Sequence, residues 1–238
     1  MGMRIRTAGM TMIRAWKHVL LIFLCWIWLV PNLLGQRKDF QSWWELDLRR
    51  ELSNGFELAV ELEQRFRNNS LQYDRTLMTL TGNYQLNRYL DLEAGLRAVA
   101  VQDREQQIQS KFRAHIDASA HYPFSGTDLS FRSRFQYGFD DILDVGYFRL
   151  NTLVNRNRLK LEHHLFGSRF TAFGSVESWH LLSDSPAGCT YKLRYSGGLE
   201  YALNFASRLK IRYILEDEFN VKNPLQIHIL LLGFRHDF

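Results

Sequence analysis

The stretch IQSKFRAHIDASAH, residues 108–121, alternates between two kinds of side chain along its whole length. One set is apolar or small: Ile108, Ser110, Phe112, Ala114, Ile116, Ala118 and Ala120. The other set is polar: Gln109, Lys111, Arg113, His115, Asp117, Ser119 and His121. A period of two residues is typical of a β-strand whose two faces meet different surroundings. This segment therefore predicts a long strand with one apolar and one charged face.

The same period recurs through most of the chain after residue 35. It is clear over residues 56–66, 90–100, 190–203 and 208–216, and weaker over 40–50, 75–85, 128–138, 146–165, 169–181 and 226–238. Such segments are longer than the usual strand of about 5–6 residues and suit a tilted bilayer crossing of about 9–11 residues. Bulky aromatic residues near the strand ends favour the same interpretation. We predict an all-β fold, a closed antiparallel transmembrane β-barrel; a soluble periplasmic β-protein is the disfavoured alternative.

The number of strands is less well determined by the pattern. Eleven segments are clear, whereas bacterial single-chain barrels have even numbers of strands, so we predict about twelve, within a range of 10–12. The alternation slips between Val154 and Leu159, which suggests either two strands joined at Asn155–Arg158 or one long bulged strand. Longer links at 67–74, 102–107, 139–145, 183–190 and 220–225 alternate with short ones, and long links are expected outside the cell.

The first 35 residues differ from the rest. Four basic residues precede the apolar run VLLIFLCWIWLV, residues 19–30, and the small Gly35 follows. This order predicts a cleaved signal peptide over residues 1–35 and a barrel over 36–238; a membrane anchor is the alternative, although twelve apolar residues are short for a helical span. Removing four of the 30 Lys and Arg leaves 26 against 25 Asp and Glu, so we predict no nucleic-acid partner. One cysteine, Cys189, remains, which excludes an internal disulfide.

Several motifs together resemble a family. They are DFQSWWELDL (39–48), LRRELSNGFELAVELEQRF (48–66), NRLKLEHHL (157–165), VESWHLL (176–182), LKIRYILEDEFNVKNP (209–224) and LLGFRHDF (231–238). They resemble the secreted β-barrel proteins of unknown function that are widespread in Gram-negative bacteria. The resemblance implies the fold and a location in the outer membrane, surrounded by its lipid. It implies no reaction and no catalytic residue.

The charged faces of the predicted strands divide by sign along the chain. The acidic group is Glu45, Asp47, Glu57, Glu61, Glu63, Asp91 and Glu93. The basic group is Lys111, Arg113, Arg132, Arg134, Lys192, Arg194, Lys210 and Arg212. In a closed barrel these residues are expected to line the lumen. They would either form a salt-bridged plug in a structural or envelope-interaction barrel, or create a field across a narrow pore that selects small polar solutes.

One strand face offers an enzymatic alternative. His115, Asp117, Ser119 and His121 share one side of residues 108–121, and a Ser/His/Asp hydrolase acting on membrane lipid would need such groups. Barrel lipid hydrolases resemble one another in a His-x-Ser pair, whereas this chain has only the reversed pairs Ser178/His180 and Ser119/His121. We favour a polar lumen wall for these residues. We also predict no enzyme activity, no metal and no cofactor, since the sequence has no phosphate-binding loop and no metal-spaced Cys/His cluster.

The chain ends in an alternating segment. Leu230, Leu232, Phe234 and Phe238 fall on one face, although His236 interrupts the apolar series. A terminal aromatic residue after such alternation resembles the signal that the outer-membrane insertion machinery recognises. We therefore predict that machinery as a partner during biogenesis.

Overall fold

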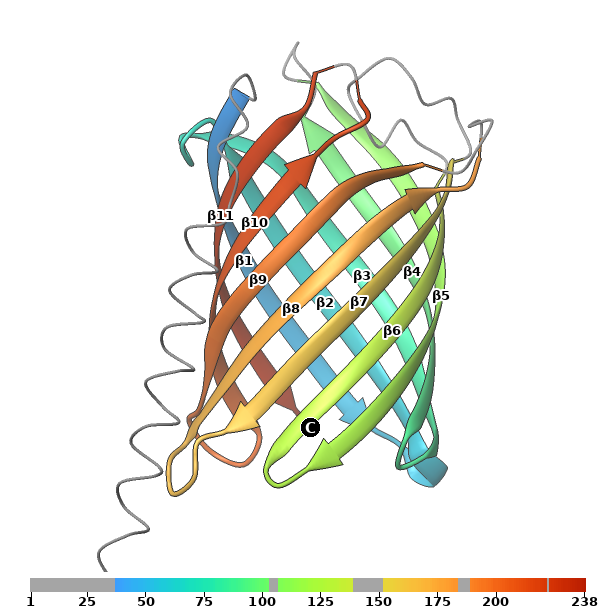
Figure 1. Cartoon of the computed structure of the whole chain (residues 1–238), viewed down its shortest axis with the longest axis vertical. Coiled ribbons are helices and arrows are strands. Elements are labelled where there is room, and N and C mark those ends of the chain that lie inside the picture. Colours follow the sequence, from blue (N-terminus) through green and yellow to red (C-terminus); the bar gives the residue numbers. More distant parts are fainter. Residues whose placement is uncertain (1–36, 103–106, 139–151, 184–188, 222) are drawn as a thin grey trace, which may run out of the picture. The chain divides into compact units, whose positions relative to one another are not determined.

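Eleven long strands wind into a barrel in the computed structural model, which describes residues 37–102, 107–138, 152–183, 189–221 and 223–238 (Figure 1). The predicted signal peptide lies outside the described residues. All the described strands belong to one unit, Arg37–Phe238. In the part of the chain that is described, no helix is long and apolar enough to span a bilayer.

The strands follow one another around the barrel in chain order. They are β1 (Arg37–Glu51), β2 (Phe56–Arg67), β3 (Gln72–Asn87), β4 (Leu90–Gln102), β5 (Ile108–Phe124), β6 (Thr127–Gly138), β7 (Thr152–His164), β8 (Phe170–Leu181), β9 (Thr190–Ala202), β10 (Ser207–Glu218) and β11 (Leu225–Asp237), with a short 3₁₀ turn at Ser53–Gly55. Each consecutive pair is antiparallel. The barrel closes where β1 pairs with β11, and this pairing is parallel. The closed all-β barrel predicted from the sequence is thereby confirmed.

The seam explains how the barrel closes with an odd number of strands. An up-and-down chain of eleven strands has its first and last strands pointing the same way, so closure requires the parallel register that runs from Arg37 opposite Leu225 to Arg49 opposite Asp237. The described strands number eleven, within the predicted 10–12 but one short of the preferred twelve. The antiparallel pattern predicted for the whole barrel fails at this one seam.

Strand β7 resolves the slip in the sequence pattern. It runs unbroken from Thr152 to His164 and pairs with β6 without a register shift. The proposed division at Asn155–Arg158 is therefore wrong, and so is the proposed bulge. The pattern slips because the apolar Val154 faces inward while Asn155 and Asn157 face outward, so polarity inverts although the backbone alternation continues.

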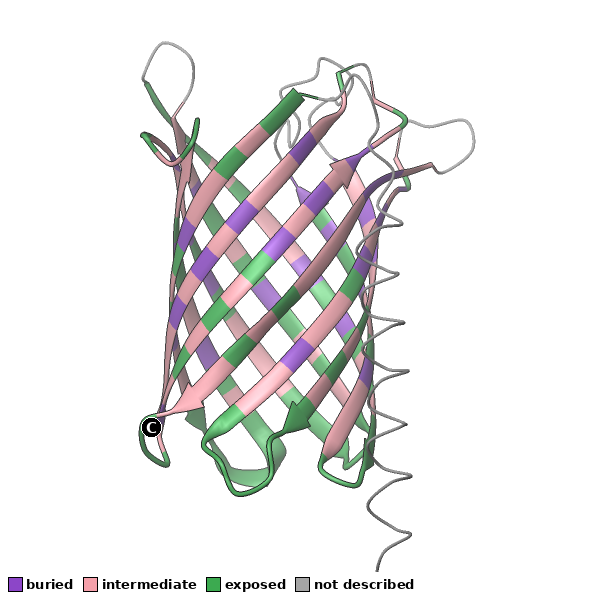
Figure 2. Cartoon of the chain, turned by 60° about the vertical axis from the view of Figure 1, so that its left-hand side comes forward, coloured by how far each residue is buried: buried purple, intermediate pink, exposed green. Residues whose placement is uncertain are grey.

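The two faces of the wall have the opposite polarity to those of a soluble domain. Large apolar residues of β4 and β5, such as Leu96, Phe112 and Ile116, are 60–65% exposed on the outside. Charged residues, such as Asp117 and Glu177, are 3% exposed inside. Figure 2 shows the resulting alternation of exposed and buried positions along the strands. An apolar outer wall of this kind suits a hydrocarbon environment.

The connections divide the barrel into two ends. The turn end carries the short connections 52–55, 88–89, 125–126, 165–169 and 203–206 (Figure 1). The opposite end, which we call the loop end, is where β2, β4, β6, β8 and β10 finish, and the described connection 68–71 lies there. The β5–β6 turn has only two residues, Ser125 and Gly126, both with positive φ (44° and 74°). Such turns match the twist of paired strands, and glycine adopts positive φ without strain. The long link predicted at 67–74 is wrong, because only residues 68–71 join β2 to β3, no more than join strands at the turn end. The other predicted long links each include residues outside the described parts of the chain.

Candidate functional site

The lumen contains two cavities, one above the other. The turn-end cavity has a volume of about 870 Å³, and the loop-end cavity has a volume of about 780 Å³. Both are lined by the same five side chains at their boundary: Trp43, Arg65, Arg97, Arg156 and Arg194. We call these five residues the separating layer, because they lie between the two cavities.

Aromatic rings contact three of the four arginines of the separating layer: Arg65, Arg156 and Arg194. The guanidinium carbon of Arg65 lies 3.6 Å from the centre of the Trp43 ring, and that of Arg156 lies 3.9 Å from the centre of the Trp179 ring. An arginine stacked on an aromatic face is attracted by the negative charge of that face. Trp43 is only 3% exposed and packs with Ile214, Ile229 and Leu231. The layer is therefore fixed to the wall by apolar as well as ionic contacts.

One carboxylate, that of Glu177 on β8, gathers arginines from three other strands. Arg132 Nη2 donates to it at 2.7 Å, Arg156 Nη2 donates to both of its oxygens at 3.1 and 3.0 Å, and Arg194 Nη1 lies 3.7 Å away. Arg194 also pairs with Glu216 of β10. Arg132 also lies 3.6 Å from Asp117, so Arg132 and Arg194 each have a second carboxylate beside them, and Glu177 is the one carboxylate that all three arginines share.

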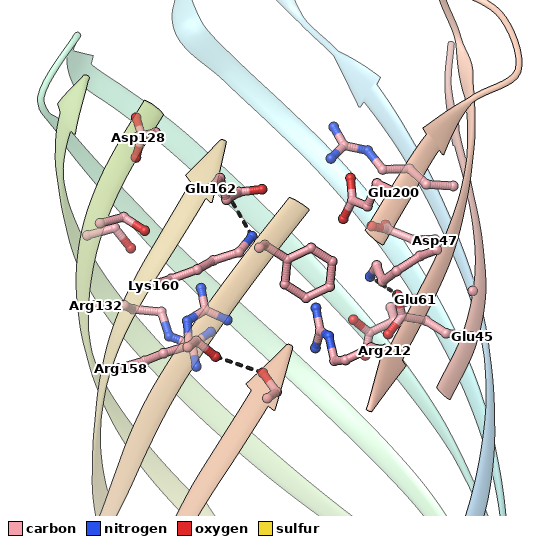
Figure 3. Close-up of a pocket in the computed structure, with 18 of the residues that line it drawn as sticks. Glu45, Asp47, Glu61, Asp128, Arg132, Arg158, Lys160, Glu162, Glu200 and Arg212 are labelled. Carbon is pink, nitrogen blue, oxygen red and sulfur yellow. Dashed lines mark hydrogen bonds and ion pairs between the residues drawn. The ribbon is translucent and has the colours of Figure 1, made fainter. Parts of the chain in front are cut away.

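The turn-end cavity has an acidic wall and a basic wall. Figure 3 shows Glu45, Asp47 and Glu61 on one side and Arg158 and Lys160 on the other. The acidic residues come from β1 and β2 and the basic ones from β7, which lies five strands away from them in either direction. The field therefore runs across the barrel rather than along it.

Two arginines of this cavity have unused hydrogen-bonding capacity. Within the described residues, Arg158 and Arg212 make no ion pair or side-chain hydrogen bond, and the Nε of each is buried without a partner. Phe173 lies between the basic groups: its ring centre is 5.1 Å from the Arg212 guanidinium and 5.4 Å from Lys160 Nζ. These side chains could receive an anionic group against an aromatic face.

The loop-end cavity is strongly basic. Ten basic side chains line it against four acidic ones. The basic residues are Arg37, Lys38, Arg65, Arg67, Arg75, Arg97, Arg113, Arg156, Lys192 and Arg194, and the acidic ones are Asp39, Asp74, Glu216 and Glu218. An excess of one sign in a cavity attracts solutes of the other sign.

The structure places nearly all the sequence-predicted lumen residues on the cavity walls. The acidic Glu45, Asp47, Glu57, Glu61, Glu63, Asp91 and Glu93 all line the turn-end cavity, as do the basic Arg132, Arg134, Lys210 and Arg212. Arg113 and Lys192 line the loop-end cavity, and Arg194 lines both. Lys111, opposite Val99 in the β4–β5 register, lines neither.

Sequence reasoning did not single out the most connected residues. Glu177, Arg156 and Arg158 lie in segments where the alternation is weak. Arg65 and Arg97 lie in segments where it is clear, but the predicted lumen lining did not include them. Strict alternation along β7 and β8 could have identified Arg156, Arg158 and Glu177. It places the even-numbered residues of β7 and the odd-numbered residues of β8 inside the barrel.

The strand face proposed as an enzymatic alternative is occupied by ion pairs. Arg134 donates to both oxygens of Asp117 at 2.6–2.8 Å, and His115 Nε2 lies 3.2 Å from Glu93. His121 Nε2 lies 3.1 Å from Asp91. Within the described residues, Ser119 hydrogen-bonds to neither histidine. The four groups are thus not arranged as a nucleophile, a base and an orienting acid.

Glu93, His115 and Asp117 have the composition of a metal site, with ligand atoms within 4.8 Å of one another. Arg134 Nη2 already lies 3.0 Å from Glu93 and 2.6 Å from Asp117. The guanidinium therefore supplies the positive charge that a metal ion would bring. These residues are explained as an ion-pair cluster of the wall.

The closing strand bears the predicted terminal pattern on its outer face. Leu230, Leu232 and Phe234 alternate with inward-facing residues of β11, and the backbone N–H of Phe238 donates to Arg49 O at 2.8 Å. His236 Nδ1 lies 2.9 Å from Ser207 Oγ, and its ring meets that of Phe238 edge-on at 4.6 Å. His236, the polar residue in this apolar series, thus has a hydrogen-bond partner in Ser207.

A comparison with protein families decides the relationship of this chain. Residues 40–224 match the model described as "Protein of unknown function (DUF2490)". The chain belongs to the DUF2490 family. A search of curated protein sequences finds no relative of this DUF2490 chain.

Among solved structures, the DUF2490 barrel is similar to one described as "NanC porin structure in rhombohedral crystal form". The TM-score is 0.55 at 13% sequence identity, over 84% of this chain and 99% of the porin chain. At this identity the likeness shows a shared barrel fold.

Proposed function

We propose that this DUF2490 protein is an outer-membrane barrel that forms a narrow passage for small anionic or zwitterionic solutes, without catalysis in its lumen. The observation that carries the proposal is the pair of lumen cavities, of about 870 and 780 Å³, separated by a single layer of side chains. The arginines are held by aromatic and ionic contacts, and a charged solute that takes the place of their carboxylate partners would let the long side chains move aside, so the layer can open without a change in the wall. The porin that the fold resembles supports the same class of function.

The charges of the walls suggest which solutes pass. The basic loop-end cavity would concentrate anions, and the separating layer presents four guanidinium groups to them. In the turn-end cavity, Arg158 and Arg212 offer donors for a carboxylate or phosphate, while the acidic wall opposite suits an ammonium or hydroxyl group. A solute with both kinds of group matches both walls.

The outer surface supports the membrane location. Its apolar side chains would contact outer-membrane lipid, and the loop end would face outside the cell. Leu230, Leu232, Phe234 and Phe238 would present the signal read by the insertion machinery. Fractionation tests this part of the proposal: recovery in the soluble periplasmic fraction would contradict it.

Conductance of the purified protein in planar bilayers tests the passage. We expect small, anion-selective steps, and we expect an added small carboxylate such as glutamate to reduce the current. Heat-modifiable migration in unboiled detergent gels must first show that the sample is folded. A folded sample that inserts but conducts no ions would support a second candidate, a structural barrel.

That second candidate has its own support in the ion pairs of the interior. Arg132, Arg156, Glu177, Arg194 and Glu216 form a continuous network across five strands, β6 to β10. Such a network could hold the lumen shut and act only to stiffen the wall.

A further inference from the structure

The outer wall carries a polar cluster among the apolar side chains of β6 to β9. We call it the outer-wall cluster, and it comprises Ser133, Asn155, Asn157, Ser178, His180 and Thr190 from strands β6 to β9. Glu177 and Trp179 of β8 face the lumen, so the intervening Ser178 and the following His180 face outward. The neighbouring outward residues Phe135, Leu159 and Val176 are large, apolar and exposed. Polar side chains are costly on a surface that faces hydrocarbon, so a cluster of them indicates a functional site.

Three members of the cluster form a hydrogen-bonded chain. Ser178 Oγ lies 3.0 Å from His180 Nε2, and Thr190 Oγ1 lies 2.6 Å from His180 Nδ1. The β8–β9 pairing shifts register between Trp179 and His180, and this irregularity brings Thr190 opposite His180. The imidazole is thus held between a hydroxyl on one nitrogen and an orienting oxygen on the other. This is the arrangement that activates a serine nucleophile.

A hydrogen-bond donor lies beside the serine. Asn157 of β7 is the direct cross-strand partner of Ser178, at a separation of about 5 Å between Cβ atoms. Its amide donates to Asn155 Oδ1 at 2.6 Å, and Asn155 in turn donates to Ser133 Oγ and Arg134 O. An amide nitrogen has two hydrogens, and within the described residues one hydrogen of Asn157 has no protein acceptor. It could stabilise an oxyanion formed at Ser178.

The position of the cluster indicates what could reach it. Ser178 lies three residues before the loop-end terminus of β8 at Leu181, which is about 10 Å along the strand. With the loop-end strand termini at the membrane surface, as the proposed location implies, this depth falls where headgroups join acyl chains. The ester bonds of a membrane lipid lie in that region, whereas a water-soluble substrate would not enter it.

We propose that Ser178, His180 and Thr190 form a lipid-ester hydrolase site on the outer wall of the barrel. Ser178 Oγ attacks the ester carbonyl carbon while its proton passes to His180 Nε2. The tetrahedral intermediate expels the lipid alcohol, which takes that proton, and leaves an acyl-serine. Water, deprotonated by the same nitrogen, then releases the fatty acid and restores Ser178. Thr190 is a positioning residue that fixes the imidazole.

This site rests on the membrane location proposed above but not on the pore. It also differs from the strand face His115, Asp117, Ser119 and His121, which lies inside the barrel. The two activities can therefore be measured separately on one folded sample.

The test is fatty-acid release from phosphatidylethanolamine in mixed micelles, together with labelling by a fluorophosphonate probe. We expect labelling at Ser178, and a loss of about 100-fold in release for Ser178→Ala or His180→Ala. Ser175→Ala is the matched control, because Ser175 lies on the same strand and hydrogen-bonds Ser196 at 2.8 Å inside the barrel. Its release should equal that of the unchanged protein.

The test of Thr190 must distinguish positioning of the His180 imidazole from a purely structural contribution. Thr190→Ser keeps the oxygen and should retain activity, whereas Thr190→Val should lower the rate and shift its pH dependence. A folded, heat-modifiable protein that neither reacts with the probe nor releases fatty acid would overturn the site, whatever its conductance. Activity that survives Ser178→Ala would overturn it as well.

Discussion

Arg156 donates to both carboxylate oxygens of Glu177 in the middle of the lumen, at 3.1 and 3.0 Å. The two residues belong to the adjacent strands β7 and β8, and Glu177 is 3% exposed. Arg132 and Arg194 approach the same carboxylate. The negative charge of Glu177 therefore reduces the repulsion among these two arginines and Arg156. In the proposed passage, the stability of the wall and the ion selectivity would therefore depend on the same group.

Glu177→Gln should weaken the barrel and make it more anion-selective. A neutral amide removes the carboxylate that Arg156 pairs with and one of the two beside Arg132 and Arg194, and breaking a buried ion pair costs about 3–5 kcal/mol. We expect a lower urea midpoint of unfolding and a reversal potential shifted toward anions in a salt gradient. Glu200→Gln is the control, since Glu200 lines the same cavity and makes no ion pair in the described parts of the chain. Equal effects of the two substitutions would argue against a central role for Glu177.

Trp43→Ala should join the two cavities. The indole is part of the separating layer, and its removal leaves an open volume between two spaces of about 870 and 780 Å³. We expect the single-channel conductance to rise several-fold, at a cost in stability of about 3–5 kcal/mol. Trp44→Ala is the matched control, because Trp44 is 52% exposed on the outer wall. An unchanged conductance in folded Trp43→Ala protein would contradict the separating layer.

Gly95→Ala should impair folding. A Cβ at this position would lie 2.3 Å from His115 Cε1 and 2.8 Å from Thr81 Cγ2, so the imidazole would have to leave its place beside Glu93. Overpacking of this kind costs about 1–3 kcal/mol, and we expect a smaller fraction of heat-modifiable barrel after refolding in detergent. Gly82→Ala provides the comparison, since its Cβ would make an ordinary contact of 3.7 Å with Leu58. Similar refolding yields for the two variants would refute the packing argument.

Cys189 reports the orientation of the barrel. It is a partly exposed free thiol at the loop end, beside the start of β9. If the loop end faces outside, a membrane-impermeant maleimide should label it in intact cells. With Cys189→Ser in place, Ser125→Cys at the turn end should react only after permeabilisation. The reverse pattern of labelling would invert the proposed topology.

The alternation of residues 108–121 was enough to predict a strand and its inner face. A one-residue slip would exchange all the apolar and polar positions, so a strand with two unlike faces has a single register relative to the lumen. The same reasoning failed over β7, where Asn155 and Asn157 are polar but face outward. Their side chains are satisfied by each other and by Ser133, a cross-strand contact that no local pattern contains.

The partners of the site residues could not be predicted, because they depend on how the strands are staggered around the barrel. Glu177 meets arginines of β6, β7 and β9, which are 17 to 45 residues away in the sequence. The chain from Ser178 through His180 to Thr190 depends on a register shift that is invisible in the sequence. The alternation along a strand predicts which side chains face inward. The strand order and register then determine which of them form ion pairs.

The parallel seam between β1 and β11 gives the polypeptide a polarity across the membrane. β1 starts at the loop end, with Arg37 opposite Leu225, and β11 finishes at the turn end, with Asp237 opposite Arg49. A reporter fused ahead of Arg37 and one fused after Phe238 would therefore emerge in different compartments. Joining the two ends in a circular permutant would require a linker that runs the full height of the wall, so the strand order of this barrel cannot be rotated by a short loop.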